Sequence, residues 1–205
     1  VGLMHSEYFA GIASYEYVAV AFKLDSVSSM GFSFLRFGVD DIPNTLDLVD
    51  ANGNFDYNRI TSFSSSDNAF LLSYARLLGS SGLSIGGNVK IIYRKVGAFA
   101  SAIGFGIDAS ATYRKKNWRF GGVLRDVTNT FNAWEFNTSE FDEAFIRTGN
   151  DIPENSVELT LPKMILGVGY LFTMKKNFHV YPEANLEFTF DGKRNVLVRT
   201  NVVSI

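Results

Sequence analysis

The chain has 205 residues, of which 46% are hydrophobic and 20% charged, and 19 basic against 21 acidic side chains give a formal net charge of −2. This composition is too apolar for a disordered chain and not basic enough to indicate a nucleic-acid partner. Because there is no cysteine, a disulfide framework, a thiolate metal site and a cysteine nucleophile are excluded. The sequence begins at Val1 without an initiator methionine or leader-like segment, so we expect a processed or incomplete chain.

Alternation of apolar and polar residues dominates the chain and predicts strands. Over residues 101–114, one face carries Ile103, Phe105 and Ile107, and the other carries small or polar residues such as Gly106 and Asp108. The same pattern predicts nine strands, with a tenth at 5–12; the nine lie at 15–24, 29–38, 68–78, 83–95, 101–114, 118–127, 161–172, 178–191 and 196–205. Many reach the ~9–11 residues with which a tilted strand crosses a bilayer.

The expected connections alternate in length along the chain. Short connections at 25–28, 79–82, 115–117 and 173–177 alternate with longer ones at 39–67, 96–100, 128–160 and 192–195. An up-and-down meander then places all tight turns at one end, as in outer-membrane barrels. The sequence therefore predicts an all-β, antiparallel up-and-down transmembrane β-barrel of about ten strands. It forms one domain over residues 1–205, has long outer loops at about 39–67 and 128–160, and lies in the bacterial outer membrane.

Aromatic residues flank two of the expected turns. Tyr113 and Trp118 lie beside the lysines of 115–117, and Phe172 and Phe178 lie beside those of 175–177. This arrangement favours an aromatic girdle at the lipid headgroups. The alternative is a set of ordinary core aromatics beside solvated turns.

If the apolar faces contact lipid, the polar faces line an interior that carries both signs of charge. A two-residue turn at 116–117 would place Asp108 opposite Arg125, and a loop centred on Ala98 would place Asn88 opposite Asp108. Similar centring places Lys163 opposite Glu187, with Arg199 near it. The predicted interior network is Lys90, Arg94, Asp108, Arg119, Arg125, Lys163, Glu183, Glu187 and Arg199. We interpret it as a packed, mutually paired interior, with a selective channel or ligand cavity as the alternative.

The sequence offers no catalytic constellation. His5 and His179 are the only histidines, and no serine or carboxylate stands at a recognisable spacing from either. Residues 50–56 have some features of a calcium loop, but the glycine is misplaced and Thr61 stands where the bidentate glutamate belongs. We therefore expect a non-enzymatic protein with no metal and no cofactor.

The expected 128–160 loop is rich in aromatic residues, which suggests a folded cap over the barrel mouth, a partner-binding surface or a loop packed on itself. These residues are Phe131, Trp134, Phe136, Phe141 and Phe145.

Several segments resemble the PorV/PorQ family. They are FSFLRFGVDDIP at 32–43, AFLLSYAR at 69–76, GGNVKIIYR at 86–94, NWRFG at 117–121 and FDGKRN at 190–195. The resemblance implies an outer-membrane barrel of Bacteroidetes, similar in fold to FadL transporters, with fourteen strands and no catalytic residue to carry over. The family's Asn-Pro-Ala plug segment is absent here and only nine or ten strands are expected, so we predict that this chain is part of a longer barrel.

The family resemblance implies a role in type IX protein secretion, in which outer loops bind the translocon or secreted cargo. The alternative is a FadL-like transporter of hydrophobic small molecules, for which Leu35, Phe37, Leu71 and Ile165 would line the interior. Outer-membrane lipid and protein partners are expected in the first case, and no nucleic acid in either. An outer-membrane hydrolase and a soluble β-sandwich or lipocalin-like carrier are further hypotheses with less support.

Overall fold

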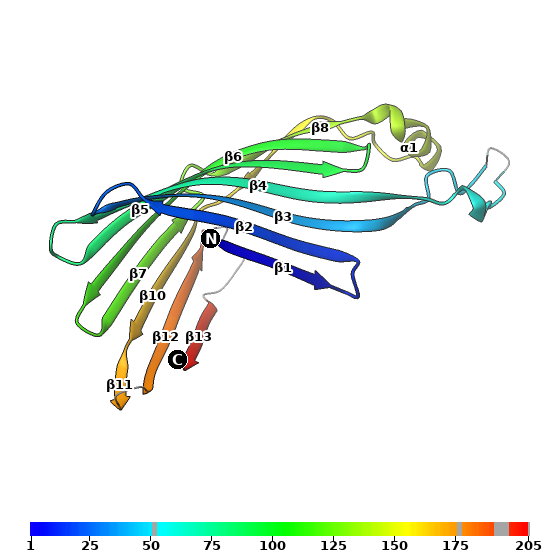
Figure 1. The fold of residues 1–205 in the computed structure, drawn as a ribbon. Helices are drawn as coiled ribbons and strands as arrows, with labels where there is room; N and C mark the ends of the chain where they lie inside the picture. The colour runs from blue at the N-terminus through cyan, green and yellow to red at the C-terminus, as the bar shows by residue number, and fades with distance from the viewer. Residues whose placement is uncertain (51–52, 176–177, 191–196, 205) are drawn as a thin grey trace.

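The computed structural model describes residues 1–50, 53–175, 178–190 and 197–204, which form one antiparallel 13-stranded sheet (Figure 1). Its strands are β1 (Gly2–Tyr8), β2 (Ala13–Lys23), β3 (Ser28–Asn44), β4 (Thr61–Leu78), β5 (Leu83–Val96), β6 (Ala100–Lys115), β7 (Trp118–Arg125), β8 (Thr130–Phe136), β9 (Ser156–Thr160), β10 (Lys163–Tyr170), β11 (Phe172–Lys175), β12 (Phe178–Thr189) and β13 (Leu197–Ser204). One short helix, α1 (Asp142–Thr148), and two 3₁₀ turns, η1 (Tyr57–Arg59) and η2 (Thr138–Glu140), lie in the connections. The predicted all-β class is confirmed.

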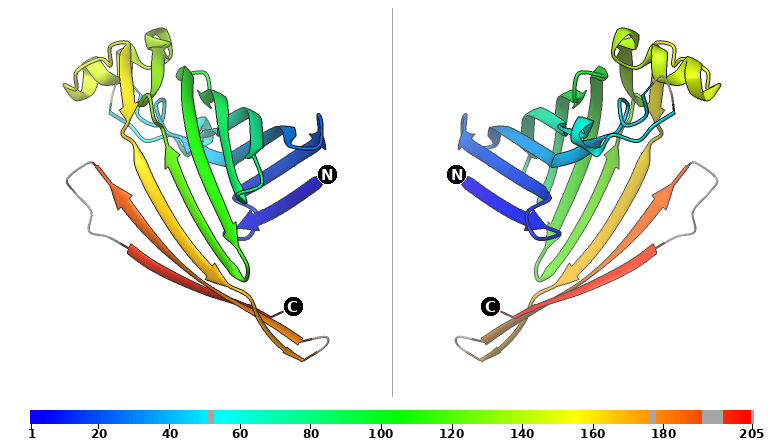
Figure 2. Two further views of the ribbon diagram at one scale, coloured as in Figure 1. Left: turned by 90° about the vertical axis from the view of Figure 1, so that its left-hand side faces the viewer. Right: turned by 90° about the vertical axis from the view of Figure 1, so that its right-hand side faces the viewer.

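The sheet is a meander, because strands that pair are mostly neighbours in sequence. We call each run of the chain from one end of the sheet to the other a pass. Strands β7 and β8 form one interrupted pass, since both pair with β6, and strands β9, β10 and β11 form another. Within the described ranges the strands thus make ten passes, in line with the expected ten. Figure 2 shows that the sheet is strongly bent, and its edges β1 and β13 pair only with β2 and β12 among the described residues. The sheet is therefore open and curved in this part of the chain.

Cross-strand pairing places one apolar row across eight strands. The row runs through Leu3, Val18, Phe34, Phe70, Ile91, Phe105, Phe131 and Leu159. A second row runs through Val20, Phe32, Leu72, Val89 and Ile107. We call this the outer face, and we call the opposite face, which carries Lys90, Arg94 and Asp108, the inner face.

Burial is inverted relative to a water-soluble sheet. On the outer face Ile91 and Ile103 are 53% and 64% exposed, whereas Asp108 and Asn132 on the inner face are 7% and 4% exposed. Among the described apolar residues only Ala13, Ala102 and Phe141 are buried. The expectation that apolar and charged side chains lie on opposite faces of the sheet is confirmed, and the apolar side chains are the more exposed.

The strand ends differ from the sequence expectation because strands continue into segments predicted as loops. The loop expected at 39–67 is shorter, since β3 continues to Asn44 and β4 begins at Thr61. The pairing shifts register between Val39 and Ile42, and Asp41 takes a positive φ of 54°. This bulge interrupts the alternation, which concealed the rest of the strand.

The loop expected at 128–160 is likewise mostly ordered structure, comprising β8, η2, α1 and β9. The tenth strand, expected at 5–12, lies at Gly2–Tyr8, because Phe9, Ala10 and Gly11 have positive φ and form a turn. Among the described residues, no helix is long and apolar enough to cross a membrane.

The short turns after β2, β4 and β6 lie at the end of the sheet opposite these longer connections, whereas the short turns after β1 and β5 lie at the same end as them. At the turn after β2, Asp25 Oδ1 accepts hydrogen bonds from the backbone N–H of Val27 and Ser28, both at 2.7 Å. The Val27 bond lowers the pKa of Asp25 below its usual value. The expected two-residue turn at 116–117 is confirmed, because Lys115 pairs with Trp118.

We expect Lys116→Gly to stabilise the protein by about 1 kcal/mol, because Lys116 has a φ of 53° in the left-handed region that disfavours a residue with a Cβ. Denaturant unfolding of detergent-refolded protein, followed by tryptophan fluorescence, measures the change. Lys115→Gly is the matched control: Lys115 lies at the end of β6, where glycine costs about 0.5–1 kcal/mol. Equal effects of the two substitutions would contradict this account of the turn.

Candidate functional site

A compact ionic cluster lies at the centre of the inner face. Lys90 Nζ lies 2.9 Å from Asp108 Oδ1 and also donates a hydrogen bond to Asp126. The backbone N–H of Asp126 donates to Asp108 Oδ1 at 2.9 Å, and Thr130 donates to the Asp126 carboxylate. The Lys90, Asp108 and Asp126 side chains are only 10–13% exposed. Such a pair-and-hydrogen-bond network is needed to offset the desolvation of the charges.

Backbone geometry brings Asp126 into this cluster. The pass formed by β7 and β8 is interrupted at 126–129, where Asp126 and Asn129 have positive φ and Val127 N–H donates to Ile107 O at 2.8 Å. Arg125 precedes the interruption and is the backbone register partner of Lys163 on the neighbouring strand β10. Strict alternation would place Asp126 on the face opposite to Arg125, and the interruption turns its carboxylate to the inner face instead.

Gly106 makes room for the cluster. It lies between Lys90 and Thr130 in the pairing of β5, β6 and β8, and a Cβ at this position would overlap the Thr130 hydroxyl and Lys90 Cε. The neighbouring Thr130 and Lys90 side chains therefore fill the space that a side chain at this position would need.

We expect Gly106→Ala to destabilise the protein by about 1–3 kcal/mol, because the added methyl group forces the buried lysine and threonine apart. Denaturant unfolding again gives the free energy. Gly121→Ala is the matched control on the same face, since no atom lies within 4 Å of a Cβ built there. A loss for Gly121→Ala as large as that for Gly106→Ala would contradict the steric argument.

The predicted interior network lies on the inner face but divides into separate groups. Lys90 joins Asp108, Arg94 joins two other carboxylates, and Lys163 Nζ pairs with Glu187 Oε1 at 2.6 Å. Arg119, Arg125 and Glu183 have no ion pair among the described residues, although Glu183 Oε1 accepts a hydrogen bond from Asn185 at 2.9 Å. The Arg199 side chain and the lysines of 176–177 and 191–196 lie outside the described residues.

The expected registers are partly confirmed. Asn88 pairs with Asp108 as expected. The register of Lys163 with Glu187 is wrong by two residues, because Lys163 pairs with Thr189 and Ile165 with Glu187; their ion pair is diagonal. Arg199 pairs with Asn185, two residues from Glu187, so the backbone register agrees with the expectation that Arg199 lies near Glu187. The pairing of β11 with β12 shifts register between Thr173 and Lys175, which a symmetric hairpin does not anticipate.

A second ionic group surrounds Arg94 near the end of the longer connections. Arg94 Nε and Nη2 bond the two carboxylate oxygens of Asp67 at 2.9 and 3.2 Å, and Nη1 bonds Glu158 Oε2 at 3.0 Å. The indole N–H of Trp134 donates to the same Glu158 oxygen at 3.0 Å, and the Arg94 guanidinium lies 5.0 Å from the Trp134 ring centroid. Both sides of the guanidinium fork are thus occupied.

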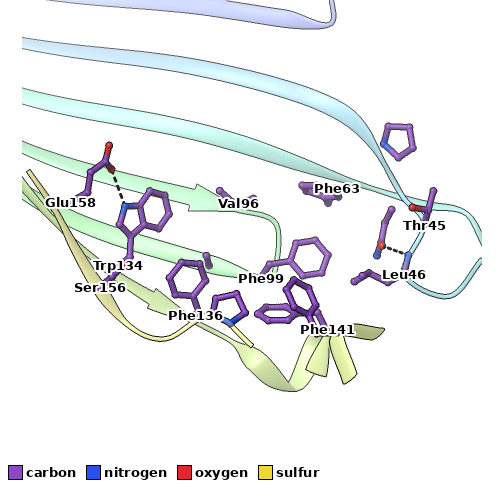
Figure 3. Close-up of a pocket in the computed structure, with 15 residues that line it drawn as sticks. Thr45, Leu46, Phe63, Val96, Phe99, Trp134, Phe136, Phe141, Ser156 and Glu158 are labelled. Atoms are coloured by element: carbon purple, nitrogen blue, oxygen red, sulfur yellow. Dashed lines mark hydrogen bonds between the residues drawn. The ribbon is translucent and has the colours of Figure 1, made fainter. Parts of the chain in front are cut away.

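Beside this group is an apolar cavity of about 640 Å³ (Figure 3). Glu158 and Trp134 lie at one end of it, and Thr45 and Leu46 lie at the other. Its aromatic lining comprises Phe63, Phe99, Trp134, Phe136, Phe141 and Phe145. The volume is in the ~300–1,000 Å³ range of small-molecule sites, so we take this cavity as the candidate functional site.

The cavity is held by contacts between segments far apart in the sequence. The Phe99 ring meets the Phe63 ring edge-to-face with centroids 5.0 Å apart, and the Phe141 and Phe145 rings are tilted against each other with centroids 5.1 Å apart. Arg147 of α1 donates to two backbone carbonyls of the β3–β4 connection, at 3.0 and 3.1 Å. These bonds fasten α1 over the cavity, so the cap is folded against the sheet.

The five loop aromatics predicted as a cap or partner surface separate by face. Trp134, Phe136, Phe141 and Phe145 line the cavity, whereas Phe131 lies in the outer apolar row and is 43% exposed. Of the residues proposed to line the interior of a transporter, Leu35, Phe37, Leu71 and Ile165 share the inner face with Lys90 by register but do not line this cavity.

Sequence reasoning missed Asp67, Asp126, Glu158 and the cavity residues contributed by 43–46. Asp67 lies just before the start of the strand expected at 68–78, and Glu158 lies inside the expected 128–160 loop. Extending the alternation of β4 by one residue would have found Asp67 opposite Arg94.

The histidines have other partners. His179 Nδ1 lies 3.2 Å from Thr173 Oγ1, and His5 lies 3.5 and 3.8 Å from Glu7 and Glu16. Among the described residues, no group of three or more histidines and carboxylates is arranged to hold a metal ion. Neither protein-family models nor curated proteins give a match to this chain.

Proposed function

We propose that the chain is part of a non-enzymatic outer-membrane β-barrel of the PorV kind, which takes part in type IX secretion by binding the translocon or cargo at the end that carries the longer connections. The observation that carries the membrane assignment is the inverted polarity, with exposed apolar rows outside and buried ionic groups inside. Barrel closure, through the edges β1 and β13 or through further strands, belongs to this proposal.

The height of the apolar band supports the membrane assignment. Along β6 the outer face stays apolar from Ile103 to Tyr113. At ~3.3 Å per residue and a tilt of ~45°, this segment spans about 23 Å, close to the ~25 Å band of outer-membrane barrels. Beyond Ile103 the outer row becomes polar, with Ser66, Lys95, Ser101 and Glu135 in register.

Aromatic residues mark the turn end of the band. Their rings follow one another on the outer face at centroid distances of 4.5–6.2 Å, through Tyr113, Phe120, Trp118, Tyr170 and Phe172. This series fits the aromatic girdle at a headgroup layer better than a buried core, since Trp118 and Phe172 are 46% and 49% exposed.

We expect Leu72→Arg to lower the free energy of folding into phosphatidylcholine vesicles by about 2–4 kcal/mol, because Leu72 is 52% exposed in the middle of the apolar band. Denaturant titration of the vesicle-inserted protein measures this change. Ser73→Arg on the next residue is the control, because Ser73 lines an inner hollow of about 270 Å³. Stable folding in detergent-free buffer, or equal losses for both variants, would contradict a membrane location.

Partner binding is assigned to the end with the longer connections because exposed apolar side chains gather there. Phe55, Tyr57 and Ile146 are 66%, 73% and 70% exposed, and they lie on the β3–β4 connection and on α1. Exposed aromatic and aliphatic groups on folded connections are typical of protein-binding surfaces.

We expect Tyr57→Asp combined with Ile146→Asp to abolish co-purification of type IX translocon components or cargo with the detergent-solubilised protein. The loss follows from placing two charges in an apolar contact. Ser80→Asp, in the tight turn after β4, should leave co-purification unchanged. Absence of any type IX component with the wild-type chain would refute the secretion role without bearing on the membrane location.

A FadL-like transporter of hydrophobic compounds is the second candidate, and the cavity favours it. An aromatic-walled space of about 640 Å³ at one end of the inner face is a suitable first binding site for an apolar compound. The inner face beyond the cavity carries the ionic groups of Arg94 and Lys90. These groups interrupt any apolar path along the described sheet, which weakens this candidate.

A further inference from the structure

We propose that the aromatic cavity binds an amphipathic organic cation, an ammonium group on an apolar body, in preference to a carboxylate of the same shape. This inference rests on the cavity and is independent of the type IX role. It deepens the transporter alternative by naming the charge of the ligand.

The apolar body of the ligand is selected by the walls. Phe63, Phe99, Phe136, Phe141 and Phe145 surround a space large enough for a phenyl ring with a short alkyl chain. Because Phe141 is only 6% exposed, a ring seated beside it would be removed from water. The aromatic faces also attract an ammonium group, which a neutral alkane wall would not do.

The charge of the ligand is selected by Glu158, the single ionisable residue among those that line the cavity. Its side chain is 51% exposed, so it is accessible to a ligand. Both of its hydrogen bonds among the described residues, from Arg94 and Trp134, go to Oε2. The other oxygen, Oε1, is therefore the acceptor that an ammonium group would use.

Arg94 does not reverse this preference. Its Nε and Nη2 are held by the two oxygens of Asp67, and its Nη1 by Glu158. The three side chains together carry one negative charge, so the polar end of the cavity is acidic. A carboxylate ligand would have to displace Asp67 or Glu158 from the guanidinium and would be repelled by the carboxylate that remains.

The connections around the cavity strengthen the negative potential. Residues 45–60 carry three carboxylates against one arginine, and residues 137–155 carry five against one. Both segments contribute residues to the cavity lining and are joined by Arg147, so these charges belong to the segments that border the cavity. A field of one sign around an opening raises the local concentration of the opposite charge.

Three probes that differ only in the polar end test the proposal on detergent-refolded protein. They are 4-phenylbutylamine, 4-phenylbutan-1-ol and 4-phenylbutanoate, titrated calorimetrically in a nonionic detergent at pH 7 and low salt. The amine should bind at least about 10-fold more tightly than the carboxylate, with the alcohol between them; a 10-fold ratio of Kd corresponds to about 1.4 kcal/mol.

Glu158→Gln assigns the effect to one side chain, because glutamine keeps the shape and an acceptor for Trp134 but removes the charge. The amine affinity should fall to that of the alcohol, and the alcohol affinity should stay unchanged. Glu154→Gln is the matched control, since Glu154 belongs to the same acidic segment but does not line the cavity.

Equal binding of amine and carboxylate, tighter binding of the carboxylate, or no binding of any probe by the wild-type protein would overturn the proposal. The probe series on the wild-type protein decides the matter even where Glu158→Gln fails to fold. Failure of type IX components to co-purify would leave these binding results unaffected, so the two proposals fail separately.

Discussion

A single layer of sheet has no second layer to cover it, and this constraint determines the rest of the structure. Only Ala13, Ala102 and Phe141 among the described apolar residues are buried, so the sheet lacks the hydrophobic core that stabilises a soluble domain of this size. The apolar rows of the outer face, with Ile91 and Ile103 more than half exposed, need an apolar surrounding. In the proposed membrane location, a bilayer would supply that surrounding over the whole band at once, whereas a single protein partner would have to match a strongly bent surface.

The inner face has the opposite problem, because it must keep charges where little water reaches them. Lys90 is stabilised there because it bonds both Asp108 and Asp126. The bend at 126–129 brings the second of these carboxylates to the inner face. Gly106 then has to lack a side chain, since Thr130 and the lysine occupy that space. Backbone irregularity, glycine and ion pair are therefore parts of one solution to the burial of a cation.

The sequence predicted the strands correctly where apolar and polar residues alternate regularly. Strands such as β5 and β6, with unbroken alternation and short turns, were located nearly to the residue, and the Asn88–Asp108 register was correct. Prediction failed where the backbone departs from strict alternation: the bulge at Asp41 hid the end of β3, and the bend at 126–129 placed Asp126 on the unexpected face. The candidate site was predicted only in part for the same reason: four of its aromatic residues were named in the expected 128–160 loop, but Glu158 was missed because it lies on a strand assigned to that loop.

One feature of the sequence indicates the position of the cavity: within single strands, the apolar and polar residues exchange faces. In β8, Phe131 lies on the outer face and Asn132 on the inner face, but four residues after Phe131 the outer residue is Glu135, with Trp134 and Phe136 on the inner face. Strand β5 shows the same reversal, from Ile91 outside to Lys95 outside with Val96 in the cavity wall. A strand that leaves an apolar phase for water has to exchange the polarity of its two faces at the boundary. The cavity begins where that exchange occurs. In the proposed membrane location, the end of the apolar band and the start of the aromatic site would therefore follow from one boundary between lipid and water.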